Sequence, residues 1–153
     1  MNFLSIAVTG VFIACSTNAV ASTAHDNELL RIGAVDSNYR YINLGYAERF
    51  FKTLQTVLRS SLPLEVEEGI FITGVEASPY STKYIYRTDT IFSKEEIANV
   101  KIAFNNPDMI SFACKRIYQS KYQRANNTVN YLNYYDYNGT KITSVMLNKF
   151  KCS

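Results

Sequence analysis

Apolar residues recur at helical spacing in the first part of the chain. Tyr46, Phe50, Leu54 and Leu58 are four positions apart, and polar residues occupy the opposite side. This pattern predicts an amphipathic helix. We expect the helix to end near Ser60 or Ser61, because Pro63 biases the residue before it away from helical geometry.

From Gly69 onward, β-branched and aromatic residues replace the helical pattern. Residues 70–77 and 82–88 flank Ser78-Pro79-Tyr80-Ser81, a sequence typical of a turn. These runs predict an antiparallel hairpin. Gly74 within the first run indicates a bulge or a close neighbour.

Two helical segments are expected next. Ser93 and Glu96 have the spacing of a capping box at the start of the first. Pro107 suits the first position of the second, with Asn106 as its N-cap. The apolar face of that second helix carries Ile110, Cys114 and Ile117, so Cys114 is expected to point toward the core.

A second hairpin is predicted around Asn138-Gly139, a pair typical of a type I′ turn because both residues tolerate positive φ. With these two as the loop, residues 128–137 and 140–150 pair so that three facing pairs result: Tyr135 with Ile142, Tyr131 with Met146, and Leu132 with Val145. Both faces of the hairpin are then partly apolar. One is expected beneath the helices, and the other presents tyrosine.

Residues 1–21 have the pattern of a signal peptide. An apolar stretch from Phe3 to Cys15 is followed by Ala19-Val20-Ala21, and no charged side chain precedes Asp26. The stretch is too short to span a bilayer. It indicates export, with the periplasm or the exterior as the location.

Phe12-Ile13-Ala14-Cys15 also resembles a lipobox, so Cys15 is a candidate lipidation site and an outer-membrane lipoprotein is the alternative. Phe12 and Ile13 are poor residues for that motif, and the leader has no Lys or Arg. We therefore favour soluble cleavage. Either route removes Cys15 from the folded domain.

Cys114 and Cys152 then remain as a pair. In an oxidising compartment a disulfide is the favoured interpretation, worth about 3 to 4 kcal/mol from loop entropy. Buried free thiols are the alternative. A metal site or a catalytic thiol would require histidine, and the one histidine, His25, lies beside the cleavage site in a segment expected to be disordered.

The sequence therefore predicts an α+β fold with an antiparallel sheet of about four strands, helices packed on one face, and one disulfide. The expected order is α-β-β-α-α-β-β. Residues 22–43 are expected to form an N-terminal tether or short helix, and residues 44–153 a single domain.

Charge and composition narrow the function. The net charge of +3 comes from scattered Lys and Arg, which does not predict nucleic-acid binding. Glu65, Glu67 and Glu68 form an acidic cluster, for which solvated charge is the ordinary explanation. We therefore predict no catalytic residue, no metal ligand, no cofactor and no enzymatic activity.

Tyrosine is the most informative residue type, with twelve in the chain. Its large ring and polar tip suit it to protein interfaces. The candidate partner-binding residues are Tyr84, Tyr86, Tyr131, Tyr134, Tyr135 and Tyr137. The alternative is that half of the tyrosines pack in the core and the rest cover the sheet.

The layout resembles the S-type pilotins of type II secretion. The residues that carry the resemblance are Leu62-Pro63, Tyr84-x-Tyr86, the helix with Cys114, Tyr131-x-x-Tyr134-Tyr135-Asp136-x-Asn138-Gly139 and Cys152. The resemblance implies a sheet flanked by helices, a helix-to-strand disulfide, lipid attachment and a secretin segment as partner.

The alternative function is that of a periplasmic immunity or inhibitor protein that blocks a toxin or a cell-wall hydrolase with a loop at 77–82 or 123–128. A membrane is a partner here only if Cys15 is lipidated.

Overall fold

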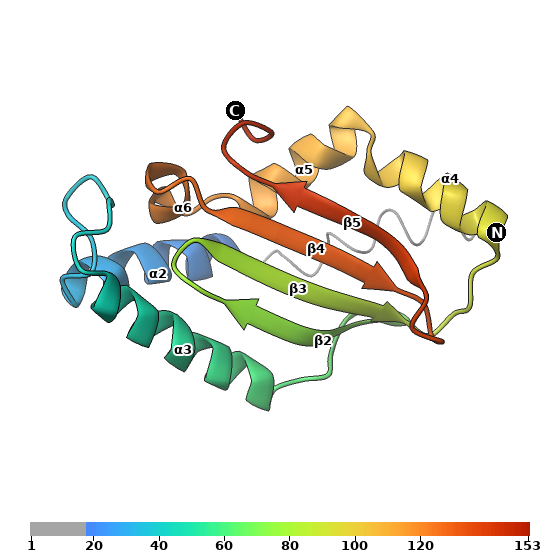
Figure 1. Cartoon of the computed structure of the whole chain (residues 1–153), viewed down its shortest axis with the longest axis horizontal. Helices are drawn as coiled ribbons and strands as arrows, with labels where there is room; N and C mark the ends of the chain where they lie inside the picture. Colours follow the sequence, from blue (N-terminus) through green and yellow to red (C-terminus); the bar gives the residue numbers. More distant parts are fainter. Residues whose placement is uncertain (1–17) are drawn as a thin grey trace.

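The computed structural model of the chain describes residues 18–153, with side chains from residue 23 onward (Figure 1). Residues 1–17 of the predicted leader, with Cys15, lie outside the described residues. Within residues 18–153, no helix is both long enough and apolar enough to cross a membrane. The division into leader, tether and domain stays a prediction.

One five-stranded sheet forms the centre of the fold, in the spatial order β1-β2-β3-β4-β5. Its strands are β1 (Leu64–Glu67), β2 (Ile70–Ala77), β3 (Ser81–Thr88), β4 (Val129–Tyr135) and β5 (Lys141–Leu147). The α+β class is confirmed, with one strand more than the four expected.

The expectation of a wholly antiparallel sheet is wrong at the centre, where β3 and β4 run parallel. Three helices separate these strands in the sequence: α4 (Lys94–Phe104), α5 (Pro107–Ile117) and α6 (Lys121–Ala125). They return the chain to the end of the sheet where β3 began, and a crossover of that length is what a parallel pair needs. Periodicity located both hairpins but gave no information on how they join.

The remaining helices are α2 (Asn18–Arg31) and α3 (Leu44–Ser60). Helix α3 is the predicted amphipathic helix, and it ends at the predicted position. Asn43 caps its first turn by accepting the Tyr46 N–H. The Ser93–Glu96 capping box of α4 and the Asn106–Pro107 start of α5 are confirmed as well.

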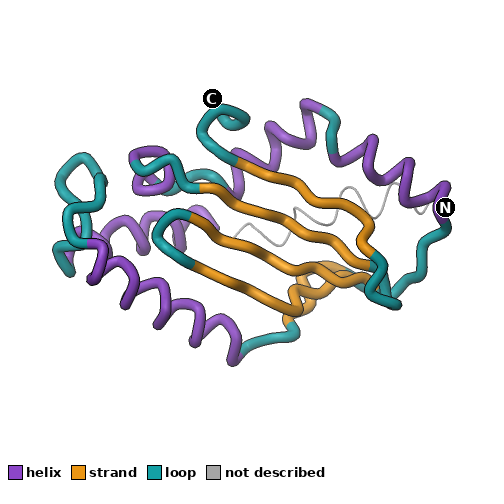
Figure 2. Tube along the Cα trace, viewed as in Figure 1, coloured by secondary structure: helices purple, strands orange, loops and turns teal. Residues whose placement is uncertain are grey.

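The helices cover one face of the sheet, as predicted. Side chains from α4 and α5 pack on β4 and β5 in the larger core cluster, which includes Val100, Phe104, Leu132 and Val145. A second cluster joins α2 and α3 through Leu29, Phe51 and other residues, and it includes Tyr122 of α6. In Figure 2 no described helix passes in front of β3 and β4, so their opposite face stays uncovered.

Strand β1 pairs with only the first part of β2, so the rest of that outer edge has no neighbouring strand. Helix α3 covers this part of the edge. Gln55 Oε1 accepts the Ala77 N–H at 2.8 Å, and Arg59 Nε donates to the Val75 carbonyl at 3.2 Å. Side chains thus satisfy backbone groups that would otherwise invite another strand.

The turn between β4 and β5 differs from the type I′ turn that the sequence predicts. Gly139 has a φ of +81°, but Asn138 does not have positive φ. Asp136 organises the loop instead: its Oδ1 accepts the Thr140 N–H at 2.7 Å, and its carbonyl accepts the Gly139 N–H at 3.0 Å. An irregularity in the register between Tyr134 and Tyr135 makes Tyr135 face Lys141 rather than Ile142, whereas the predicted Tyr131–Met146 and Leu132–Val145 pairs are confirmed.

Helix α2 is better ordered than the sequence suggested for this segment. His25 was expected in a disordered stretch, but it lies on α2 with its ring edge-on to Phe50 at 5.8 Å. Asp26 and Leu29 on the same helix are buried. The apolar contacts of Leu29 with α3 explain the order of this segment.

Candidate functional site

The uncovered face of the sheet is the candidate functional site, and we call it the open face. Three rows of aligned residues cross β3, β4 and β5 on this face: Lys83–Tyr131–Met146, Ile85–Asn133–Ser144, and Arg87–Tyr135–Lys141. Strand β2 adds Glu76 beside Lys83 and Phe71 beside Arg87. Side chains on alternate positions of a strand share a face, so these residues form one continuous surface.

The middle row is flat and closely packed. Ser144 Oγ and Asn133 Oδ1 are hydrogen-bonded at 2.8 Å. Ile85 lies over Gly74, where an added Cβ would come within 2.9 Å of the Ile85 side chain. The predicted bulge at this glycine is present too, between Ile72 and Gly74. Gly74 therefore lets Ile85 lie along the face.

Charge on the open face is unbalanced toward cations. Lys83 and Glu76 form an ion pair at 2.7 Å, and their side chains are 45% and 53% exposed. The hydrogen bond from Lys83 lowers the pKa of Glu76, and the same bond raises the pKa of Lys83. Arg87 and Lys141 are exposed on either side of Tyr135, and neither forms an ion pair with another described residue.

Three of the six candidate tyrosines lie on the helix-covered face. The rings of Tyr86 and Tyr134 stack at 4.6 Å with an interplanar angle of 17°, and both side chains are buried. Tyr84 is half-buried against the same cluster. Tyr84, Tyr86 and Tyr134 therefore take part in the packing of the helix-covered face, and their role in binding a partner stays a prediction.

The other three candidates are accessible. Tyr131 and Tyr135 are half-buried on the open face, separated by Asn133. Tyr137 is 62% exposed in the turn beyond β4, apart from the rows of the face. The alternation of side chains in β4 explains this division, because Tyr134 and Tyr135 are neighbours in sequence and point to opposite faces.

A cavity between α2 and α3 was not expected from the sequence. It has a volume of about 460 Å³ and is lined by Glu28, Ile32, Tyr46, Arg49, Phe50 and Thr53. The Arg49 guanidinium lies 4.7 Å from the centre of the Tyr46 ring. Sequence reasoning missed it because residues 22–43 were expected to form a tether or a short helix, and neither expectation placed this segment against α3.

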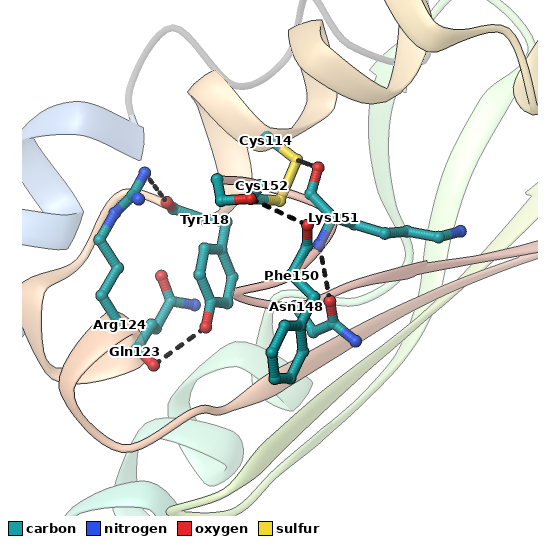
Figure 3. The surroundings of a disulfide bond; sticks show 9 residues. Cys114, Tyr118, Gln123, Arg124, Asn148, Phe150, Lys151 and Cys152 are labelled. Carbon is teal, nitrogen blue, oxygen red and sulfur yellow. Dashed lines mark hydrogen bonds between the residues drawn. A yellow bond between two sulfur atoms is a disulfide. The ribbon is translucent and has the colours of Figure 1, made fainter.

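The disulfide is confirmed. Cys114 on α5 is bonded to Cys152, which lies beyond β5, and the two Cα atoms are 5.3 Å apart (Figure 3). The bond fastens the chain after β5 to the helix layer. It rules out the alternative of two free thiols.

The described side chains offer no metal centre, since residues 23–153 contain no group of three His, Cys, Asp or Glu placed to hold an ion. The acidic cluster has local roles: Glu65 Oε1 accepts the Gly69 N–H at 3.2 Å, and burial raises the pKa of Glu67. For His25, burial lowers the pKa despite the neighbouring Asp26 carboxylate.

The fold and the disulfide together define a small α+β protein with helices on one face of a mixed sheet. No protein-family model matches the chain, and no curated protein sequence does. Three solved structures are similar. They are a putative secreted protein from Pseudomonas aeruginosa, the pilotin EpsS from the Vibrio vulnificus type 2 secretion system, and the type II secretion pilotin AspS from Vibrio cholerae.

The Pseudomonas protein is 9% identical with a TM-score of 0.52, covering 73% of this chain and 97% of its own. EpsS is 13% identical with a TM-score of 0.49, covering 72% and 94%. AspS is 13% identical with a TM-score of 0.40, covering 71% and 94%. At these identities the likeness is one of fold, and the Pseudomonas protein is the one of the three with a TM-score above 0.5.

Proposed function

We propose that the chain is a non-enzymatic protein-binding domain of the cell envelope. Its open face would receive an amphipathic segment of a partner protein that carries apolar and acidic residues. The observation that carries this proposal is the composition of the face, where two accessible tyrosines alternate with apolar side chains and unpaired cations.

The chemistry of the face favours such a partner. Tyr131, Met146 and Ile85 offer apolar area at one end and in the middle. Arg87 and Lys141 flank Tyr135 at the other end, and an acidic side chain would find two cations there. Tyrosine loses little conformational entropy on binding, which is why it is enriched in interfaces.

The finer proposal is a pilotin-like secretion accessory whose partner is a secretin segment. The motif layout described from the sequence supports it, and so does the disulfide between a helix and the chain after the final strand. The fold shared with a secreted protein fits an exported domain. Lipidation at Cys15 remains part of this proposal.

Affinity purification from the native envelope tests the function. The parent chain is expected to recover a secretin, and Tyr131→Ser and Tyr135→Ser are expected to lose it. Tyr137→Ser is the matched control, because this exposed tyrosine lies off the open face. Equal recovery by all three variants would contradict the proposal for the face.

A second function, inhibition of a toxin or hydrolase, has one specific observation in its favour. Tyr80 is 50% exposed at the tip of the β2–β3 hairpin, and the Tyr41 hydroxyl donates to the Pro79 carbonyl at 2.7 Å. The hairpin tip is thus braced by Tyr41 and presents one exposed tyrosine. The other candidate loop is less suitable, because Gln123 and Thr128 are buried. Recovery of a single hydrolase, lost on Tyr80→Ala, would favour this function.

A further inference from the structure

The C-terminal turn displays an exposed aromatic ring on an ordered support. Phe150 is 85% exposed. The Lys151 N–H donates to Asn148 Oδ1 at 2.9 Å, and the Cys152 N–H donates to the Asn148 carbonyl at 3.0 Å. The disulfide then fastens Cys152 to α5, so the ring is held out by a turn of fixed shape.

Exposed lysines lie next to Phe150 in the sequence. Lys149 and Lys151 flank Phe150 and are exposed, and Figure 3 shows the side chains of Phe150 and Lys151 directed away from the disulfide. On the helix to which the turn is bonded, exposed Lys115 directly follows Cys114.

No acidic side chain balances these charges nearby in sequence. After Asp108, the sequence contains one acidic side chain, Asp136, which is 1% exposed and hydrogen-bonded within the β4–β5 loop. The sequence around the turn is therefore cationic.

We propose that this turn is a peripheral membrane anchor that places Phe150 among the headgroups of an anionic bilayer, with Lys149 and Lys151 at the lipid phosphates. An aromatic ring between lysines suits the boundary between headgroups and acyl chains. A single ring on a narrow turn is too small an area for a stable protein interface. This inference goes beyond the protein-binding function, because it uses none of the open face.

Helix α5, to which the turn is bonded, carries a second exposed aromatic ring beside a cation. On α5, Phe112 is 36% exposed, and the Arg116 guanidinium lies 4.5 Å from the centre of its ring. This helix thus presents an apolar ring and a positive charge next to each other. Helix α2 also contacts α5, so the N-terminal helix and the turn both adjoin this one helix.

Vesicle co-sedimentation tests the proposal. The mature chain expected from soluble cleavage, residues 22–153, is mixed with phosphatidylcholine vesicles, and with vesicles in which about one third of the lipid is phosphatidylglycerol. Binding to the anionic vesicles is expected to be at least about tenfold stronger and to weaken as salt is added. Lys149→Gln and Lys151→Gln are each expected to weaken it about fivefold.

The aromatic contribution is tested with Phe150→Ser against Ile91→Ser. Ile91 is 58% exposed but has no lysine beside it, so its loss is expected to leave binding unchanged. Phe150→Ser is expected to reduce binding to the anionic vesicles at least about tenfold, with an unchanged urea midpoint. Every variant keeps the same N-terminus, so the differences report on the turn.

Two outcomes would overturn the inference. One is equal binding of the Phe150→Ser variant and its parent to anionic vesicles. The other is that Phe150→Ser abolishes recovery of a protein partner while leaving vesicle binding intact, which would make the turn a protein-binding element. Neither outcome depends on Tyr131 or Tyr135. A failure of the membrane-anchor proposal can therefore be distinguished from a failure of the proposed protein-binding function.

Discussion

The Asp26 Oδ1 atom accepts the backbone N–H of Tyr122 at 3.0 Å, across 96 positions of the chain. Its Oδ2 atom accepts the neighbouring Lys121 N–H at 2.9 Å. A carboxylate of α2 therefore caps the first turn of α6, and Asp26 is buried where it does so. This contact ties the N-terminal helix to the segment that leads into β4.

Replacing Asp26 tests the contact. Asp26→Ala is expected to lower the free energy of unfolding by about 2 to 3 kcal/mol, because two backbone N–H groups lose a charged acceptor where burial limits access of water. Asp108→Ala, an exposed carboxylate in the first turn of α5, is the control and is expected to cost less than about 1 kcal/mol. Urea denaturation measures both. Equal costs would show that the cap contributes nothing beyond an ordinary helix-end charge.

The disulfide supplies a second prediction. Cys114→Ser with Cys152→Ser is expected to lower the free energy of unfolding by about 3 to 4 kcal/mol, because the unfolded chain regains the freedom of a loop of 38 positions. Denaturation of the parent with and without reductant provides an independent measurement. A parent whose stability is insensitive to reductant would contradict the prediction.

The division of the tyrosines gives a third prediction. Tyr86→Ala is expected to cost about 3 to 5 kcal/mol, because it empties a buried site stacked on Tyr134. Tyr131→Ser on the open face is expected to cost less than about 1.5 kcal/mol and to affect partner recovery instead. Thermal unfolding and affinity purification of the same two variants separate stability from binding. The reverse pattern would mean that the two faces have been assigned wrongly.

Stability at high pH should depend on Tyr122. Burial raises the pKa of this hydroxyl well above its usual value near 10. The unfolded chain therefore loses the proton first, so the contribution is present below about pH 10 and is lost as the pH rises further. Tyr122→Phe is expected to show a smaller fall in stability between pH 9 and pH 11. Parallel curves for parent and variant would exclude this contribution.

Local chemistry in the sequence was sufficient to locate most elements. The spacing from Tyr46 to Leu58, the Ser93–Glu96 box and the Asn106–Pro107 pair each depend on neighbours within a few positions, so they could be identified without tertiary information. The disulfide could be inferred because removal of the leader leaves two cysteines. That inference depended on the expected oxidising compartment and on the number of cysteines that remain, and not on the distance between them.

The features that could not be predicted from the sequence depend on contacts between distant parts of the chain. Whether β4 pairs with β3 in parallel depends on where three helices return the chain, and no local pattern encodes that. Tyr134 and Tyr135 are both tyrosine, so composition alone could not say which faces the core. Asn138 lacks the expected positive φ, and the Asp136 carboxylate accepts the Thr140 N–H in a loop longer than the predicted two residues.

The parallel pairing of β3 and β4 has a consequence for biogenesis. Residues 89–128 lie between these two strands, so β3 has one of its two neighbours missing until that whole stretch has been synthesised. Pairings between distant segments form slowly, since closing the intervening chain must come first. A polypeptide that crosses a membrane before folding gains from such a delay. An exported chain with this order of strands would therefore remain unfolded, and able to pass through a translocation channel, until residues 89–128 had followed.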